Sequence, residues 1–285
     1  MSGIVLGLAF ALVASLALNG SYVIQHVGSG SAPPIDPRHP VATLLGLLRS
    51  PAWACGAALG MGGWALHVAA LANAPLSLVQ AFVTGGLAVM APVASRVLRH
   101  PLTRVEWGGV GIVVVSLALL CVGLGNPDVH TPVRVEQMIG FLAACGIGAS
   151  LLTRAATRWR PHALGLAGGL LYGAADVAIK ALTGVAHAHG AGAVVLSPWL
   201  PVAIAGTIAA FFAFQRGLQL GSAVPVISLM TAATTAVSVA GAFLVFGDSL
   251  GRTPLLVALH LVAFALVAVA AAALAPAAAA EPAAL

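Results

Sequence analysis

The chain is poor in charged residues, in aromatic residues and in cysteine. Of its 285 residues, 7% are charged and 6% are aromatic, whereas 60% are hydrophobic. Soluble domains carry roughly 25% charged residues, so this composition excludes an ordinary soluble domain. Three separated cysteines are present, and an odd number of such thiols argues against a disulfide framework or a metal knuckle. The composition is that of a multi-pass membrane protein.

The sequence also lacks the motifs of catalysis. It has no P-loop, no HExxH pattern and no pair of acidic residues at a useful spacing. We therefore predict that the protein is not an enzyme and needs no cofactor. His187 and His189 form a His-x-His pattern, but no acid or cysteine lies close to them in the sequence. We interpret this pattern as a solvated loop and assign no residue to a metal.

Apolar runs that are long enough to cross a bilayer are abundant. A helix needs about 20 apolar residues to cross the hydrocarbon core. We predict nine spans, at residues 3–26, 51–73, 75–98, 105–124, 135–153, 162–184, 193–216, 222–246 and 254–275. Residues 41–48 are apolar but too short to cross, so we expect an interfacial or re-entrant segment there, with a tenth span as the alternative. Residues 276–285 are rich in Ala and Pro and are expected to fray.

The distribution of arginine predicts the orientation in the membrane. With nine spans, nine arginines fall on one side, and Arg134 and Arg252 fall on the other. Cytoplasmic loops collect Lys and Arg, so we predict an outside N-terminus and a cytoplasmic C-terminus. Abundant Ala, Gly and Arg suggest a bacterial inner membrane. The arginines at residues 154–160 are expected to touch anionic lipid headgroups, and no nucleic-acid role is expected.

An internal similarity predicts two inverted repeats. Residues 70–98 align with residues 217–245 as two helices joined by a turn, and residues 20–25 resemble residues 172–176. Units offset by an odd number of spans lie in opposite orientations, which is the plan of many secondary transporters. Chance similarity between Ala-, Gly- and Leu-rich helices is the alternative. The expected fold is all-α and integral to the membrane, with a first repeat at residues 1–124, a linking helix at 135–153 and a second repeat at 162–275.

Glycines at a spacing of four predict close helix packing. Gly165, Gly169 and Gly173 form a tandem GxxxG pattern in the sixth run, and Gly56 and Gly60 form another in the second. Such small residues let two helix backbones approach each other within a membrane. We therefore expect the sixth run to be the core helix of the bundle.

Two opposite charges lie within the sixth run. Asp176 and Lys180 are four residues apart, so on a helix they share one face. A charge at bilayer depth costs at least ~2.5 kcal/mol and is tolerated mainly in a packed interior or a wet cavity. We predict that the two residues bind the substrate and that Asp176 exchanges a proton. The alternative is an ion pair that only holds the helix in its bundle.

Other polar or aromatic side chains of the apolar runs are candidates for the same site. They can orient a substrate, line a pocket or, as the alternative, only bond neighbouring helices. These candidates are Tyr22, Gln25, Trp64, His67, Gln80, Tyr172 and Thr231.

Several short motifs resemble a known superfamily. Residues 63–67 (Gly-Trp-Ala-Leu-His) and 72–79 (Ala-Asn-Ala-Pro-Leu-Ser-Leu-Val) resemble the second and third helices of the drug/metabolite transporter (DMT) superfamily. Within it they are most similar to the NIPA-like magnesium transporter branch, as are residues 20–24 and 173–180. The resemblance covers roughly residues 5–275 and implies a nine-helix DMT-like fold.

The chain departs from the NIPA-like pattern at three places. Trp64 stands where that pattern has a glutamate, His67 where it has an asparagine, and Gln80-Ala81 where it has a proline. Mg²⁺ prefers carboxylates and water to imidazole and indole. We therefore predict a DMT-type secondary transporter of a small organic metabolite or amphiphile, with a NIPA-like divalent-cation transporter and a non-transporting membrane scaffold as alternatives. The expected partners are this substrate and membrane lipid, and a homodimer is left open.

Overall fold

The fold is described from a computed structural model. It covers residues 2–29, 35–36, 38–86, 92, 103–120, 122, 132–154, 159–221, 223–248, 251 and 253–278. Over these residues the chain is helical and contains no strand. The elements are α1 (Ser2–Ser29), α2 (Pro40–Leu48), α3 (Pro51–Asn73), α4 (Leu76–Gly85), α6 (Arg104–Leu120), α7 (Val135–Leu152), α8 (Arg160–His189), α9 (Ala193–Leu196), α10 (Trp199–Leu220), α11 (Ala223–Gly241), the π-helix η2 (Ala242–Phe246) and α12 (Pro254–Ala278).

Six helices of the described chain are long and apolar enough to cross a membrane. They are Gly3–Ser29, Pro51–Asn73, Val135–Leu152, Arg160–His189, Trp199–Leu220 and Leu229–Phe246. Shorter apolar helices occupy Leu76–Gly85, Trp107–Leu120 and Pro254–Leu266. Each of the nine predicted runs thus contains an apolar helix, although the third, fourth and eighth runs lie partly outside the described residues. Of the predicted tail at 276–285, residues 276–278 continue α12, and residues 279–285 lie outside the described part of the chain. The protein is a multi-pass membrane protein, and the described part of its chain is all-helical.

The segment at residues 41–48 forms the short helix α2. Its nine residues are too few to cross a bilayer, as expected from the sequence. Val41, Leu44, Leu45 and Leu48 share one face of α2, and all four are exposed. The following helix, α3, begins at Pro51, where Ser50 accepts a hydrogen bond from the backbone N–H of Trp53. Proline is well suited to this first position because its missing N–H would have no helical partner there.

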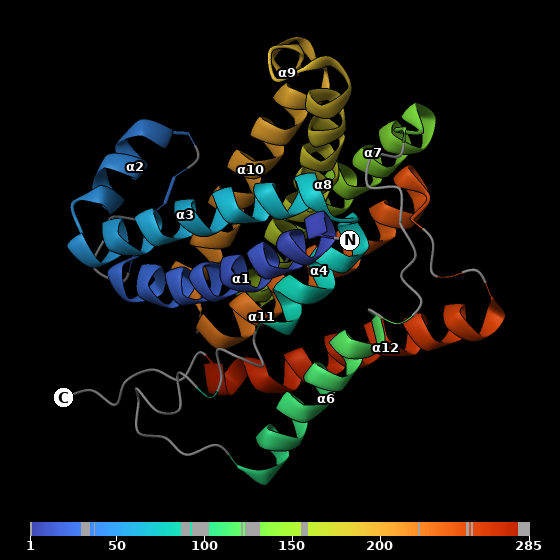
Figure 1. The fold of residues 1–285 in the computed structure, drawn as a ribbon. Helices are drawn as coiled ribbons and strands as arrows, with labels where there is room; N and C mark the ends of the chain where they lie inside the picture. Colours follow the sequence, from blue (N-terminus) through green and yellow to red (C-terminus); the bar gives the residue numbers. More distant parts are fainter. Residues whose placement is uncertain are drawn as a thin grey trace.

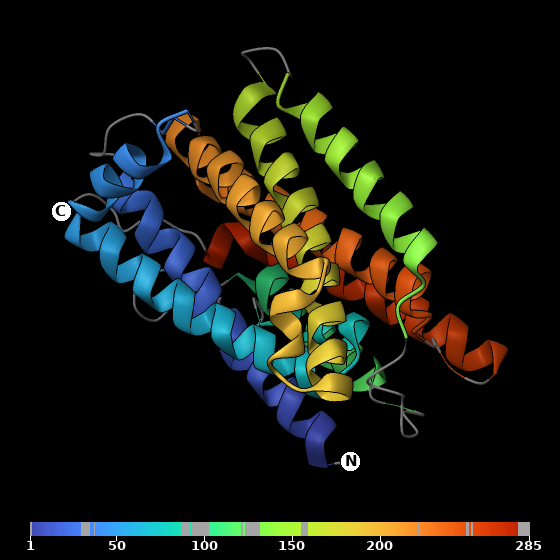
Figure 2. The same ribbon diagram turned by 90° about the horizontal axis from the view of Figure 1, so that it is seen from above.

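α8 is the core helix of the bundle, as the sequence predicted. Of its most apolar 18-residue stretch, 72% is buried, against 33% or less in the other five long helices. α8 packs against α10 and α11, while α7 runs alongside it (Figure 2). α1 packs along α3, and α6 pairs with α12 (Figure 1).

The predicted glycine patterns lie at these helix contacts. A Cβ on Gly165, Gly169 or Gly173 would meet atoms of α11 within 3 Å. A Cβ on Gly56 or Gly60 would meet Ser21 and Gln25 of α1. Two backbones therefore approach closely at each GxxxG pattern, and the approach requires residues without a side chain.

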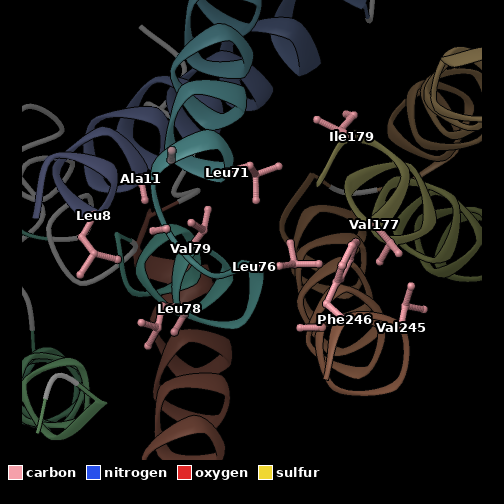
Figure 3. Packing of buried hydrophobic residues seen from close by; sticks show 14 of the residues in the cluster. Leu8, Ala11, Leu71, Leu76, Leu78, Val79, Val177, Ile179, Val245 and Phe246 are labelled. Atoms are coloured by element: carbon pink, nitrogen blue, oxygen red, sulfur yellow. The ribbon is translucent and has the colours of Figure 1, made fainter. Parts of the chain in front are cut away.

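The largest hydrophobic cluster joins both halves of the chain. Its buried members come from α1, α3, α4 and α6, from α7, and from α8, α10, η2 and α12. Figure 3 shows part of this cluster, with Leu71 and Leu76 from either side of the turn between α3 and α4. Phe246 of η2 and Val177 of α8 belong to the same cluster. The turn between α3 and α4 is thus packed within the protein.

Replacing Gly169 by alanine is expected to destabilise the bundle. The added Cβ would lie 2.4 Å from the carbonyl oxygen of Met230 and 2.6 Å from the Cβ of Ala233. Overpacking of this kind costs about 1–3 kcal/mol. The control is Gly184→Ala, because nothing lies within 4 Å of a Cβ at Gly184 on the same helix. Thermal unfolding in detergent measures both, and equal midpoints would contradict the packing described for Gly169.

Candidate functional site

A buried carboxylate lies at the centre of the bundle. Asp176 of α8 is 8% exposed and accepts hydrogen bonds on both oxygens. Gln80 Nε2 donates to Oδ2 at 2.7 Å, and Ser238 Oγ donates to the same oxygen at 3.1 Å. His67 Nε2 lies 3.1 Å from Oδ1. A buried carboxylate is tolerated where such donors replace its hydration shell.

Asp176 and its three partners come from four different helices. His67 lies on α3 and Gln80 on α4, whereas Asp176 lies on α8 and Ser238 on α11. α3 and α4 lie before the helix α7 in the chain, and α8 and α11 lie after it. The cluster around Asp176 therefore joins the two halves of the sequence. We call these four residues the Asp176 cluster.

The two tyrosines of the chain lie beside this cluster. Tyr22 on α1 and Tyr172 on α8 are its only tyrosines. Both are within electrostatic range of Asp176, and Tyr172 is also in range of Tyr22. The ring of Tyr22 contacts Phe214 edge to face, with centroids 5.1 Å apart. Both rings are partly buried against the same apolar cluster of α10 and α11. Two predicted site residues from distant parts of the sequence thus come together.

Lys180 takes partners separate from those of Asp176. Its ammonium donates to the carbonyl oxygens of Leu71 at 2.6 Å and Ala74 at 2.9 Å. Those carbonyls end α3, where the helix dipole favours a cation. The interpretation of Asp176 and Lys180 as an ion pair is therefore wrong, although both side chains are buried as predicted.

Asp248 is the acidic group that interacts with Lys180. Its Oδ2 accepts from the backbone N–H of Ser77 at 3.1 Å and from Ser77 Oγ at 2.7 Å, at the start of α4. Burial raises the pKa of Asp248, while the hydrogen bonds from Ser77 and the charge of Lys180 oppose that shift. Lys180 and Asp248 thus hold the two helix ends on either side of Pro75.

A second buried polar network lies near the other end of α3. Gln215 of α10 donates to Gln25 Oε1, and Trp53 Nε1 donates to Gln215 Oε1 at 3.5 Å. Gln25 Nε2 donates in turn to Ser21 Oγ at 3.4 Å. Gln25, Trp53 and Gln215 are each no more than 7% exposed. Gln25 therefore belongs to this network, and it has no described hydrogen bond to the Asp176 cluster.

The two remaining predicted site residues, Trp64 and Thr231, also lie outside the Asp176 cluster. Trp64 of α3 is 41% exposed, so the structure does not bring it together with His67 in a pocket wall. Thr231 of α11 is half-buried. One turn further along α11, Thr235 Oγ1 lies 2.6 Å from Thr84 Oγ1 of α4 and links the two helices.

The His-x-His pattern lies on a helix and not in a loop. α8 extends to His189, five residues beyond the predicted end of the sixth run, and both histidines are exposed in its last turn. Throughout the described part of the chain, no group of three or more His, Cys, Asp or Glu side chains is placed to hold a metal ion. Cys145 is buried and Cys55 exposed, and Cys121 lies outside the described residues.

Sequence reasoning missed several residues of these networks. Ser238, Gln215 and Asp248 were not among the candidates, yet each bonds across helices. A polar residue within an apolar run was the available signal for Ser238 and Gln215. Asp248 lies two residues after the end of an apolar run, where an acidic residue can accept from a neighbouring helix start.

Comparison with known proteins places the chain beside a transporter. It is 24% identical over 263 residues to a protein of Arabidopsis thaliana described as "Probable magnesium transporter NIPA9", covering 85% of this chain and 74% of that protein. No protein-family model matches the chain, and no solved structure matches it. The resemblance predicted from the sequence motifs is confirmed: the chain is a multi-pass membrane protein similar to a NIPA-like protein over most of its length.

Proposed function

We propose that the protein is a secondary membrane transporter of the DMT type, and that the Asp176 cluster is where its substrate or coupling proton binds. The substrate is a small organic metabolite or amphiphile, and proton exchange at Asp176 drives its movement. The relative of the chain is itself described as a transporter, which agrees with a role other than catalysis.

One observation carries this proposal: the buried carboxylate of Asp176 is held by side chains from both halves of the chain. His67 and Gln80 come from the first predicted repeat, and Ser238 comes from the second. In transporters built from inverted repeats, the binding site lies near the midplane between the repeats. A carboxylate at that place supplies a charge that a substrate or a proton can neutralise.

The helix pairing supports the predicted repeat. α1 packs along α3 in the first half, and α8 packs along α10 in the second. α6 and α12, the last helices of the two predicted repeats, pair with each other (Figure 1). Alternating access requires two such units that rock against each other around a fixed site. The linking helix of this proposal is α7, which lies against α8 and η2.

A second candidate is transport of Mg²⁺, which the similarity to a probable magnesium transporter favours. The Asp176 cluster contains one carboxylate, together with an imidazole, an amide and a hydroxyl. Mg²⁺ keeps several of its waters and binds through one or two carboxylates, so a single acid is at the lower limit of what it needs. The donor set therefore favours the organic substrate.

The orientation is part of the proposal. Nine arginines on the side of the C-terminus favour a cytoplasmic C-terminus and an outside N-terminus in the plasma membrane. In this orientation the turn between α3 and α4, with Lys180 and Asp248, faces outward. The network of Gln25, Trp53 and Gln215 then lies toward the cytoplasm.

Flux into proteoliposomes tests the function. Purified protein is reconstituted under a pH gradient, and internal pH and Mg²⁺ are followed while small organic solutes are added. Proton movement driven by a solute supports the organic transporter, and Mg²⁺ flux without it supports the second candidate. If neither proton movement nor Mg²⁺ flux is detected, transport is contradicted, and the interpretation as a membrane scaffold is favoured. Protein-free liposomes and Trp64→Ala, which changes an exposed side chain, are the controls.

A further inference from the structure

The imidazole of His67 has one nitrogen that the fold does not use. His67 is 5% exposed, and its Nε2 lies 3.1 Å from Asp176 Oδ1. Its Nδ1 is also buried and has no hydrogen-bond partner in the described structure. Buried polar atoms are normally paired, because an unpaired one loses its hydration without compensation. This atom therefore needs a partner that the protein itself does not supply.

The contact with Asp176 decides what that partner must be. An ionised carboxylate only accepts hydrogen bonds, so the proton between the two groups belongs to His67 Nε2. In a neutral imidazole the other nitrogen then carries a lone pair and no proton. In this neutral form Nδ1 is a buried acceptor, held in place by the bond on the other side of the ring. It can be satisfied only by a group that donates.

The charge of the cluster adds a second requirement. Around His67, two helices packed against α3 carry titratable groups. α1 carries Tyr22, and α8 carries Tyr172, Asp176 and Lys180. α4 and α11 contribute the uncharged Gln80 and Ser238. The ammonium of Lys180 donates to the carbonyl oxygens of Leu71 and Ala74 and not to Asp176. The negative charge of Asp176 thus meets neutral donors only, and a cation is the charge it favours.

We propose that His67 determines substrate specificity by accepting, through Nδ1, a hydrogen bond from a cationic headgroup that Asp176 attracts. The inference rests on the proposed transport function and names its substrate class: a cation that carries N–H or O–H donors. A protonated amine and a hydrated metal ion share this chemistry. A quaternary ammonium, which has the charge without the donor, does not.

Two substitutions separate this role from a structural one. His67→Gln keeps an N–H at the reach of Nε2 for Asp176 but removes the acceptor at the position of Nδ1. His67→Asn does the reverse, because its amide oxygen takes the position of Nδ1 and no atom reaches Asp176. The control is His162→Gln, since His162 also has a buried Nδ1 without a partner. His162 lies about 21 Å from Asp176 along α8, at about 1.5 Å per residue.

Binding to the purified full-length protein in lipid nanodiscs tests the inference. The probes are phenethylammonium, its N,N,N-trimethyl analogue and Mg²⁺. We expect phenethylammonium or Mg²⁺ to bind. The probe that binds shows whether the hydrogen-bond donor is a protonated amine or the water of a hydrated metal ion. His67→Gln is expected to weaken that binding about 10-fold, the worth of one hydrogen bond near a charge, while His67→Asn and His162→Gln weaken it less. Equal binding of the trimethyl analogue, or a larger loss in His67→Asn, overturns the inference.

A spectroscopic readout distinguishes this outcome from a change in folding. The chain has nine histidines, so the ¹⁵N resonances of His67 are assigned as those that disappear from the spectrum of His67→Gln. The Nδ1 resonance is expected at the position of an unprotonated nitrogen and is expected to move when the bound probe donates to it. No movement on saturation overturns the inference. If solute drives proton flux in liposomes but no cationic probe binds, the inference is overturned and the proposed transport function stands. The absence of flux overturns that function.

Discussion

Asp176→Asn is expected to lower solute transport about 100-fold while the protein remains folded. Truncating one partner of a buried, charged interaction costs about 2–5 kcal/mol, and 2.7 kcal/mol corresponds to about 100-fold. The change removes the one charge of the cluster but keeps its shape. The asparagine oxygen can still accept from Gln80 and Ser238, which both donate to Oδ2. His67 can switch its tautomer and accept from the new amide.

The measurement is initial-rate uptake into proteoliposomes at several values of pH, with the folded fraction checked by size-exclusion chromatography. The control is Asp36→Asn, because Asp36 is an exposed carboxylate whose partner His39 lies three residues away. Asp36→Asn is expected to transport at the wild-type rate. A folded Asp176→Asn variant with wild-type rate and wild-type pH dependence would remove the carboxylate from the mechanism. Equal losses in both variants would point to a general charge effect.

The helices and the central acid could be predicted from the sequence because each depends on local chemistry. A run of about 20 apolar residues predicts a span whatever surrounds it. Gly165, Gly169 and Gly173 predict a close approach because only small residues permit one. Asp176 is conspicuous because a charge within such a run needs a reason.

The partners of these residues could not be predicted in the same way. In a soluble helix, polar residues mark the outer face, whereas a membrane helix is apolar toward both lipid and core. α3 illustrates the problem: its buried side includes Trp53 and His67, yet Trp64 is exposed one turn before His67. Three residues rotate a helix by about 300°, so two residues at this spacing point about 60° apart. At the edge of the buried side of α3, an angle of this size is enough for Trp64 to be exposed while His67 is buried.

The partners of Lys180 were missed for another reason. A sequence identifies only side chains as candidate partners, and the opposite charge nearest to Lys180 on the same helix face was Asp176. The atoms that Lys180 bonds are backbone carbonyls of Leu71 and Ala74, which every residue possesses. They accept because α3 ends at Asn73, before Pro75, and the last carbonyls of a helix have no partner of their own.

Lys180→Met is expected to lower the free energy of unfolding by about 3–5 kcal/mol, the cost of breaking a buried charged interaction by removing one partner. Methionine fills a similar volume but donates no hydrogen bond, so the carbonyls of Leu71 and Ala74 lose their donor. Asp248 also loses the cation with which it interacts, while Ser77 still donates to it. The turn between α3 and α4 is expected to loosen as a result.

Denaturant unfolding in detergent measures this effect, with Arg160→Met as the control. Arg160 is exposed at the first residue of the same helix, and losing a surface charge there changes stability by about 0.5 kcal/mol or less. The double variant Lys180→Met with Asp248→Asn is expected to recover part of the loss, because it removes the uncompensated acid as well. Wild-type stability in Lys180→Met, combined with lost transport, would instead assign Lys180 to the substrate. A loss of stability that the double variant does not reduce would place its whole effect in the two carbonyl bonds.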